Sequence, residues 1–256
     1  MRHKFLTANL MVLLLSASLY GQAQSATPYT AEVPHKTSSS HSAHYIDPEV
    51  LRLDLILPTP PARSSAITTA ELAELHRIET VRTPGQITQA QADDQEQDIF
   101  IFKTVLGPDF AAAAFPVTAL LSARVHQEEA AASGPLKNIY HRARPYQVDS
   151  TLHPVCPLNP EPTSYPSGHS LSGYLLAFTL VQLVPEKQKE ILQRADEYAH
   201  NRLICGVHYA SDTEASRSIA YAIFGSLVTS ANFQRDLAAA REETRRKLNF
   251  PVSMSQ

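Results

Sequence analysis

Between about Ser65 and Leu248 the chain consists of helix-length segments separated by proline and glycine, and no segment shows sustained period-two alternation of polar and apolar residues. Such alternation is expected of a half-buried strand, whereas apolar residues three and four positions apart form one face of a helix. Leu72, Leu75 and Ile78 have this helical spacing. The sequence therefore predicts an all-α fold, organised as a single-domain helical bundle.

Seven or eight helices are expected, at about 68–83, 87–106, 116–132, 135–142, 167–184, 185–203, 210–230 and 233–248. The first is predicted to begin with the cap-like run from Thr68 to Glu71. Two stretches, 170–184 and 218–234, carry no formal charge. Their Ser, Thr, Gln and Asn residues and their limited length favour central helices of a soluble bundle over membrane spans.

Residues 1–25 have the pattern of a signal peptide. A short positive region at positions 2–4 precedes an uncharged, mainly apolar stretch at 5–20 and small residues at 21–26. An uncleaved membrane anchor is the alternative, but the apolar core is short for a spanning helix. We therefore expect a periplasmic or secreted protein with no membrane insertion of the mature chain.

The next region, residues 26–65, is rich in Pro, Ser, Thr and His and is predicted to be an extended N-terminal arm. It leaves residues 66–256 as the all-helical domain. His35, His41 and His44 lie in this arm, where their spacing matches no helical ligand pair. We expect them to be solvated loop histidines and predict no metal site.

Composition excludes one class of partner and constrains the role of the cysteines. The formal net charge is −3 at pH 7 with both signs interspersed, so nucleic acid binding is not expected.

Only two cysteines occur, Cys156 and Cys205, and both lie in the part expected to be exported to an oxidising space. A disulfide between them and two separate buried thiols are both compatible with the sequence.

Residues 93–98 contain four carboxylates toward the end of the second expected helix. A paired-carboxylate site is one interpretation, but a solvent-exposed helix face is favoured for such a run. We therefore expect exposed side chains at Asp93, Asp94, Glu96 and Asp98.

Three short segments concentrate side chains able to bind or attack an oxyanion. The first, residues 137–145, places Lys137 and Arg144 seven positions apart, which is two helical turns. The two side chains share a face if the helix continues that far, although Pro145 biases Arg144 away from helical geometry. Taken alone, this segment also fits an ordinary basic helix end.

The second segment, residues 165–170, reads Tyr-Pro-Ser-Gly-His-Ser and precedes an apolar run. A helix start exposes unpaired backbone N–H groups at the positive end of the helix dipole, which favours an anion. Gly168 allows the backbone to approach a ligand closely, Ser167 adds a donor, and His169 can exchange a proton near neutral pH. A simple helix N-cap is the alternative.

The third segment, residues 201–212, combines an arginine, a histidine and a carboxylate. Gly206 is expected to separate two helices, leaving His208 near the junction and Asp212 four residues further on. With this spacing the carboxylate accepts from one ring nitrogen and leaves the other as a nucleophile. A purely structural His–Asp pair is the alternative.

Together the three segments read K-x6-R-P, P-S-G-H and R-x5-H-x3-D. In order and spacing they resemble the tripartite signature of the type 2 phosphatidic acid phosphatase superfamily, and the exported chain is most similar to the bacterial class A non-specific acid phosphatases. The resemblance covers most of the mature sequence, although only the three motifs are specific. It implies a helical bundle of the acid phosphatase and vanadium haloperoxidase type.

The resemblance implies a role for each matched residue. His208 would be the nucleophile that forms a phosphohistidine, Asp212 would orient it, and His169 would protonate the leaving alcohol and later activate water. The phosphoryl oxygens would be held by Lys137, Arg144, Ser167, Gly168 and Arg202. Asn201 departs from the family, where Ser is common, but its amide can still donate a hydrogen bond. Three cations and a helix terminus supply the positive charge of a phosphoryl transition state without a metal or other cofactor.

We therefore expect a secreted acid phosphatase that acts on small phosphorylated organic substrates and is inhibited by vanadate. A vanadium-dependent haloperoxidase is an alternative, although such chains are usually much longer. A phosphotransferase or pyrophosphohydrolase on the same site, a membrane lipid phosphatase and a phosphate-binding module without turnover are the others. A homo-oligomer is compatible with the sequence.

Overall fold

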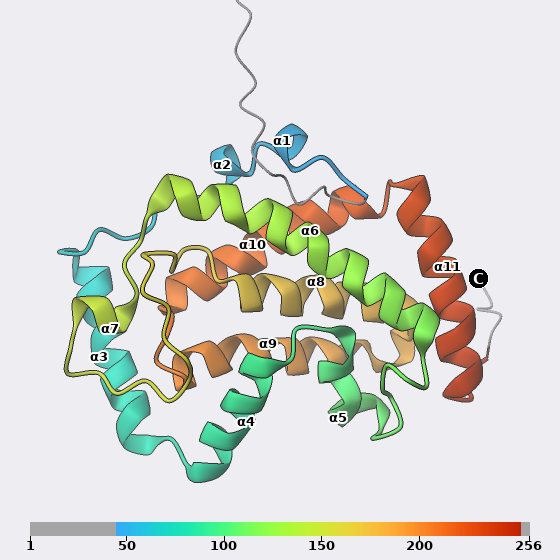
Figure 1. Ribbon diagram of the computed structural model, residues 1–256, viewed down its shortest axis with the longest axis horizontal. Helices are drawn as coiled ribbons and strands as arrows, with labels where there is room; N and C mark the ends of the chain where they lie inside the picture. Colours follow the sequence, from blue (N-terminus) through green and yellow to red (C-terminus); the bar gives the residue numbers. More distant parts are fainter. Residues whose placement is uncertain (1–44, 252–256) are drawn as a thin grey trace, which may run out of the picture. The chain divides into compact units, whose positions relative to one another are not determined.

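The structure, a computed structural model, describes residues 45–251, in which helices are joined by turns and loops and no strand occurs (Figure 1). The all-α prediction is confirmed. The predicted signal peptide, the three arm histidines and residues 252–256 lie outside the described residues. The elements are α1 (Pro48–Leu51), α2 (Leu53–Ile56), α3 (Ala66–Val81), α4 (Pro84–Gln95), η1 (Ile99–Phe102), α5 (Lys103–Leu106), α6 (Pro116–Tyr140), α7 (Pro145–Val148), α8 (Gly168–Leu183), η2 (Pro185–Lys187), α9 (Gln188–Ile204), α10 (Ala210–Leu227) and α11 (Ala231–Lys247).

Helix α8 is the centre of the bundle. It packs against α6, α9, α10 and α11, and a helix that is apolar all round is expected to be buried in this way. Leu171, Leu175, Leu176 and Leu180 are each fully buried. The prediction of a central helix in this uncharged stretch is confirmed. None of the helices within residues 45–251 is long and apolar enough to cross a membrane.

The chain direction brings the three motifs to one end of the bundle. Helices α6 and α9 run toward this end, and α8 and α10 start from it (Figure 1). The C-terminal end of α6, the N-terminus of α8 and the corner between α9 and α10 therefore lie together. This arrangement positions the candidate site.

Helix α6 corrects the expectation of two helices in residues 116–142. It continues through Pro135 to Tyr140. A proline inside a helix removes one backbone hydrogen bond and costs about 3 kcal/mol. Ala132 and Leu136, on either side of the proline, are both buried in the main core. Packing of both halves against the core outweighs the local preference for a break.

The region expected as one helix at 87–106 is three elements. Helix α4 begins at Pro84, where Thr83 and Gln86 form a capping box, because proline suits the first helical position. The helix ends at Gln95, and Asp98 then caps η1 by accepting from the Phe100 N–H. After the break, the apolar residues of η1 pack into the core.

The described part of the predicted arm, residues 45–65, is not wholly extended. It contains the one-turn helices α1 and α2, and Leu53 and Leu57 are buried in the main core. The first long helix begins at Ala66, two residues before the expected start. Ser65 is its N-cap, with Oγ accepting from the Thr68 N–H at 3.1 Å.

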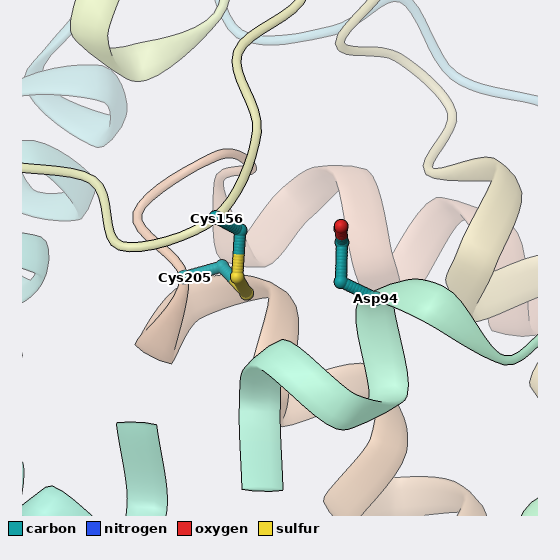
Figure 2. A group of neighbouring side chains, drawn as sticks. All are labelled: Asp94, Cys156 and Cys205. Carbon is teal, nitrogen blue, oxygen red and sulfur yellow. A yellow bond between two sulfur atoms is a disulfide. The ribbon is translucent and has the colours of Figure 1, made fainter. Parts of the chain in front are cut away.

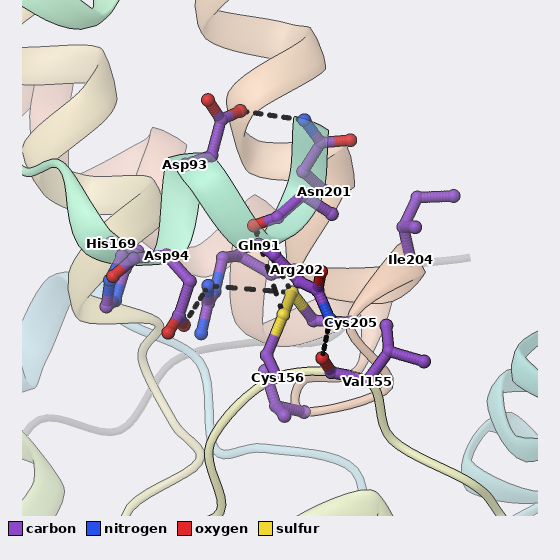
Figure 3. Close-up of a disulfide and its surroundings, with 12 residues drawn as sticks. Gln91, Asp93, Asp94, Val155, Cys156, His169, Asn201, Arg202, Ile204 and Cys205 are labelled. Atoms are coloured by element: carbon purple, nitrogen blue, oxygen red, sulfur yellow. Dashed lines mark hydrogen bonds and ion pairs between the residues drawn. A yellow bond between two sulfur atoms is a disulfide. The ribbon is translucent and has the colours of Figure 1, made fainter. Parts of the chain in front are cut away.

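Cys156 and Cys205 form a disulfide. Cys205 follows the last residue of α9, and its carbonyl also accepts from the Val155 N–H at 3.0 Å (Figure 3). The bridge therefore ties the long loop before α8 to the end of α9. Of the two alternatives that the sequence left open, the bridged one holds.

Candidate active site

His208 lies at the corner between α9 and α10. Gly206 adopts φ +75°, a left-handed conformation that suits glycine, and the Val207 N–H donates to the Arg202 carbonyl at 3.2 Å. The His208 side chain is buried, and its Nδ1 lies 3.2 Å from Asp212 Oδ2. The four-residue spacing thus places the two side chains in contact, as predicted.

Asp212 is fully buried and accepts from several segments of the chain. Arg142 Nη1 lies 2.6 Å from Oδ1, and Ser164 Oγ lies 2.6 Å from Oδ2, which also accepts from the Tyr209 N–H at 2.9 Å. Burial raises the pKa of Asp212 to about 6, and the charge of Arg142 is the largest opposing influence. The carboxyl group is held from several sides, with one oxygen directed at His208.

Arg142 is a site residue that the sequence motifs do not identify. It falls in the variable stretch of the first motif, to which the resemblance assigns no role. Its buried guanidinium pairs with Asp212 at 2.6 Å and with Glu71 at 3.1 Å, and it lies 4.0 Å over the Tyr209 ring. Glu71, expected in a helix cap, instead joins α3 to the active-site corner and also accepts from the Ser211 N–H at 2.6 Å.

The hydrogen bonds of His208 determine which ring nitrogen carries the proton. Arg144 Nη1 lies 3.2 Å from His208 Nε2. A guanidinium can only donate, so Nε2 presents its lone pair and the Nδ1–H donates to Asp212. Burial lowers the pKa of His208 well below its ordinary value, and the charges of Arg144, Arg202 and Lys137 act in the same direction. The neutral ring has the tautomer that an Nε2 nucleophile requires.

The second motif forms the N-terminus of α8. Ser167 is the N-cap, and its Oγ accepts from the Ser170 N–H at 3.4 Å and from the Ser170 hydroxyl at 3.0 Å. These contacts leave the Ser167 proton to be donated, and the first N–H groups of the helix have no partner within it. The N-cap alternative is therefore compatible with an anion site, because capping uses only the acceptor side of the hydroxyl.

Lys137 reaches the N-terminus of α8 from the last turn of α6. A Cβ at Gly168 would lie 2.8 Å from Glu129 Oε1 and 3.2 Å from Lys137 Nζ, so a larger residue does not fit there. Burial lowers the pKa of Lys137 and raises that of Glu129. A buried carboxyl group beside the predicted phosphate ligands is a second feature that the motifs do not reveal.

The helix that carries Lys137 does not continue to Arg144, which is the condition under which the two side chains would share a helix face. Helix α6 ends at Tyr140, and His141 follows in the left-handed conformation, so the two cations do not share a helix face. Both nevertheless act on His208, whose pKa they lower. The loop after α6, and not helical periodicity, brings Arg144 back to the site.

Arg202 and His169 meet at Asp94, near the end of α4 (Figure 3). Arg202 Nη1 lies 2.7 Å from Asp94 Oδ1, and His169 Nε2 donates to the Asp94 carbonyl oxygen at 3.1 Å. Burial, reinforced by the charge of Arg202, lowers the pKa of His169 to about 3. His169 is therefore neutral here, with its proton on Nε2 and its lone pair on Nδ1.

The expectation that residues 93–98 form a solvent-exposed acidic face is wrong for the first two carboxylates. Asp93 is buried and pairs with Arg194 at 2.5 Å and with the Asn201 amide at 2.7 Å. The side chain of Asp94 is 10% exposed. These residues face α9, where cationic and amide partners satisfy them; Asp98, by contrast, is exposed as predicted.

Asp94 also lies beside the disulfide (Figure 2). One oxygen of Asp94 and the sulfurs of Cys156 and Cys205 fall within 4.8 Å of one another. A thiolate is the form of cysteine that binds metals, and sulfurs joined in a disulfide have none to offer. This group does not fit a metal site.

Two buried guanidinium donors at the site have no acceptor among the described residues. They are the Nε atoms of Arg144 and Arg202. Buried polar groups are nearly always paired, so such donors require an explanation. Together with Lys137, the Ser167 hydroxyl and the helix N-terminus, they form a cationic site with donors suited to an oxyanion.

Residues 112–236 match the model of the PAP2 superfamily. This stretch is a PAP2 superfamily domain. All eight residues of the predicted catalytic and phosphate-binding set lie within the PAP2 domain, as do Glu129 and Arg142. Glu71 and Asp94, which contact residues of the candidate site from α3 and α4, lie outside it.

Relatives of the PAP2 domain include acid phosphatases. The non-specific acid phosphatase of Salmonella typhimurium is 38% identical over 124 residues, which cover 46% of this chain and 49% of that protein. An acid phosphatase of Zymomonas mobilis is 29% identical over 248 residues, 91% of this chain and 88% of that protein. The chain thus spans about half the length of the Salmonella relative in the matched region and most of the Zymomonas one.

Among solved structures, a transmembrane PAP2-type phosphatidylglycerolphosphate phosphatase from Bacillus subtilis is 20% identical to this chain. The similarity covers 70% of this chain and 92% of that one, with a TM-score of 0.49.

Proposed function

We propose that this protein is an acid phosphatase that hydrolyses phosphate monoesters through a phosphohistidine on His208. The observation that carries the proposal is the state of His208. It is neutral, Asp212 accepts from its Nδ1, and its Nε2 lone pair faces an arginine of a cationic site. The PAP2 match and the names of the relatives support the same reaction class.

Binding would use the unpaired donors of the site. The phosphoryl oxygens would accept from Lys137, Arg144 and Arg202, from the Ser167 hydroxyl and from the Gly168 N–H. Arg144 now donates to His208 Nε2. A charged phosphoryl oxygen is a stronger acceptor than a neutral ring nitrogen, so substrate would draw Arg144 away and free the lone pair.

In the first half of the reaction, His208 Nε2 attacks phosphorus and the bond from phosphorus to the ester oxygen breaks. Asp212 keeps its hydrogen bond to Nδ1–H and stabilises the positive charge that develops on the ring. His169 protonates the departing oxygen. Because its Nε2–H is engaged by the Asp94 carbonyl, the exchanging proton resides on Nδ1. The negative charge of the bound phosphate raises the pKa of His169 from its low ligand-free value.

In the second half, the neutral Nδ1 of His169 takes a proton from water. The water oxygen attacks phosphorus, the bond between phosphorus and His208 Nε2 breaks, and inorganic phosphate leaves. The histidine pair thus returns to the protonation state of the substrate complex, and His169 releases to solvent, when phosphate leaves, the proton that it took up when substrate bound. This cycle needs no metal, because three cations and a helix N-terminus supply the positive charge.

We also propose a periplasmic or secreted location and a single helical phosphatase domain over residues 66–256. The charge and hydropathy pattern of residues 1–25 supports export. The disulfide supports an oxidising compartment.

Trapping of the covalent intermediate tests the proposal. The protein, with EDTA present, would be mixed with a ³²P-labelled phosphate monoester, quenched in alkali and digested for mass spectrometry, since phosphohistidine is stable to alkali and labile to acid. Label on His208 in the wild type, and none in a folded His208→Ala variant, is the expected result. Turnover that persists in His208→Ala, or label on another residue, would overturn the mechanism.

A further inference from the structure

The end of α4 contacts two of the three motifs at once. Asp94 binds Arg202 of the third motif through its side chain at 2.7 Å, and His169 of the second through its main-chain carbonyl at 3.1 Å (Figure 3). We propose that Asp94 is a positioning residue that holds Arg202 and His169 in place for phosphoryl transfer, an inference that rests on the function proposed above. Asp94 lies outside the residues that match the PAP2 model.

The side chain of Asp94 fixes the orientation of Arg202. The guanidinium is buried, and its Nη1 contacts Asp94 on one side and Cys205 Sγ at 3.9 Å on the other. Its Nε has no acceptor among the described residues. A planar guanidinium held at Nη1 has little freedom to rotate, so its remaining donors stay available to a phosphoryl oxygen. Asp94 therefore orients Arg202 without occupying the donor that we expect to bind substrate.

The main chain of Asp94 fixes the tautomer of His169. The carbonyl oxygen can only accept, so His169 Nε2 carries the proton and Nδ1 is left to exchange protons with the reactants. The ring is further confined by the Tyr198 ring, stacked with a centroid distance of 6.4 Å. An acid–base group needs such a fixed direction to reach its proton partner.

The carboxylate of Asp94 also opposes the cations around His169. Arg202 from α9 and Lys137 from α6 both lower the pKa of His169, whereas the charge and the carbonyl of Asp94 raise it. His208 at the α9–α10 corner, Glu129 beside Gly168 and Tyr198, whose ring stacks on His169, are further titratable groups nearby. Removal of the Asp94 charge is therefore expected to make His169 harder to protonate, which weakens the protonation of poor leaving groups most.

Asp93 provides a matched control from the same turn of α4. It is more deeply buried than Asp94 and pairs with Arg194 at 2.5 Å and with Asn201 at 2.7 Å, but it has no hydrogen bond to Arg202 or His169 within the described residues. Asp93 joins α4 to α9, so Asp93→Asn is expected to lower stability. It should leave the leaving-group dependence and the pH profile unchanged.

The test compares kcat and KM between pH 4 and 8 for wild type, Asp94→Asn, Asp94→Glu and Asp93→Asn, with an aryl phosphate and an alkyl phosphate. Asp94→Asn is expected to lower kcat at least tenfold for the alkyl ester and less for the aryl ester, and to shift the alkaline limb to lower pH. Asp94→Glu, which keeps the charge, should restore part of the loss and the position of the limb. Asp94→Ser serves the same comparison if Asp94→Asn does not fold.

Two results would overturn this role for Asp94. One is an Asp94→Asn enzyme with the wild-type ratio of alkyl to aryl turnover and the wild-type alkaline limb. The other is an Asp93→Asn enzyme with the same changes as Asp94→Asn, which would indicate a purely structural effect of α4. Failure of the proposed function is separate, since it appears in the wild type as absent phosphatase turnover or an unlabelled His208.

Discussion

At the scale of single residues, the proposed catalytic groups are held by buried charges from other parts of the chain. Arg142 and Glu71 hold Asp212 and the start of α10, and Asp94 holds Arg202. A buried ion pair adds little net stability, but the loss of one partner leaves an uncompensated charge. These contacts fix geometry and make their partners sensitive to substitution.

Arg142→Ala is expected to destabilise the protein by about 3–5 kcal/mol at pH 7.5, because Asp212 is left buried without its cation. The pKa of Asp212 in the folded protein, already raised to about 6, rises further in the variant. When the pKa of a carboxyl group is higher in the folded protein than in the unfolded chain, the folded protein loses stability as pH rises through the folded pKa, because the buried group becomes charged. Urea unfolding should therefore show a smaller loss at pH 5 than at pH 7.5. An equal loss of stability at both pH values would contradict this account. Arg77→Ala, which removes an exposed ion pair with Glu74, is the control and should change stability little.

Glu129→Gln is expected to extend activity toward alkaline pH. Burial raises the pKa of Glu129, so it is neutral in acid and becomes negative beside the phosphate-binding Lys137 as pH rises through its folded pKa. The wild-type KM should then increase on the alkaline side, and the variant should show a weaker increase. The measurement is KM from pH 5 to 8 for the wild type and Glu129→Gln. Glu214→Gln, which changes an exposed carboxylate, is the control. An unchanged rise in the Glu129→Gln variant would exclude this role.

The sequence predicts site residues where local spacing encodes their geometry. The His208–Asp212 contact spans one helical turn, and the helix N-terminus follows from the Pro-Ser-Gly-His run. Local spacing does not identify Arg142 or Asp94, because their partners, Asp212 and Arg202, lie 70 and 108 positions away in the sequence. An acidic pair on a helix resembles a solvated face until the helix that covers it is known.

At the scale of secondary-structure elements, tertiary packing overrides local signals. The helix break expected before Pro135 does not occur, because buried residues on both sides anchor α6 to the core. The one-turn helices at 48–56 likewise form where buried leucines dock on the core. The order of the long helices therefore follows from the sequence more readily than the number of elements or the positions of helix ends.

Substitution of two helical glycines by alanine is expected to change the stability of the protein in opposite directions. A Cβ at Gly173 in α8 would lie 2.6 Å from Tyr198 Cδ1 of α9, so Gly173→Ala must separate the two helices and should cost about 1–3 kcal/mol. A Cβ at Gly225 in α10 would have no neighbour within 4 Å, and Gly225→Ala should stabilise by about 0.5–1 kcal/mol. Thermal unfolding of both variants checks the pair. Equal shifts would contradict the close packing of α8 on α9.

Loss of the disulfide is expected to lower stability by about 4 kcal/mol, because the bridge closes a loop between residues 49 positions apart in the unfolded chain. The Cys156→Ser, Cys205→Ser double variant should unfold at a lower denaturant concentration than the oxidised wild type. The reduced wild type should resemble the double variant. If oxidised and double-variant proteins unfold together, the bridge does not stabilise the fold.

At the scale of the whole molecule, the directions in which the helices run determine where the three motifs lie. A buried central helix presents its N-terminus at the same end as the last turn of α6 and the α9–α10 corner (Figure 1). The all-α class and this central helix follow from hydropathy alone. The meeting of the motifs at one end does not, since it depends on how the helices alternate in direction.

A crystal structure of the protein with bound vanadate tests the central claim most directly, because vanadate adopts the geometry of the phosphoryl transition state. We predict a bond between vanadium and His208 Nε2, with oxygens contacted by Lys137, Arg144 and Arg202 and with His169 Nδ1 directed at the oxygen opposite His208. Vanadate bound elsewhere, or held near these cations while His208 Nε2 remains unbonded, would contradict a phosphohistidine enzyme.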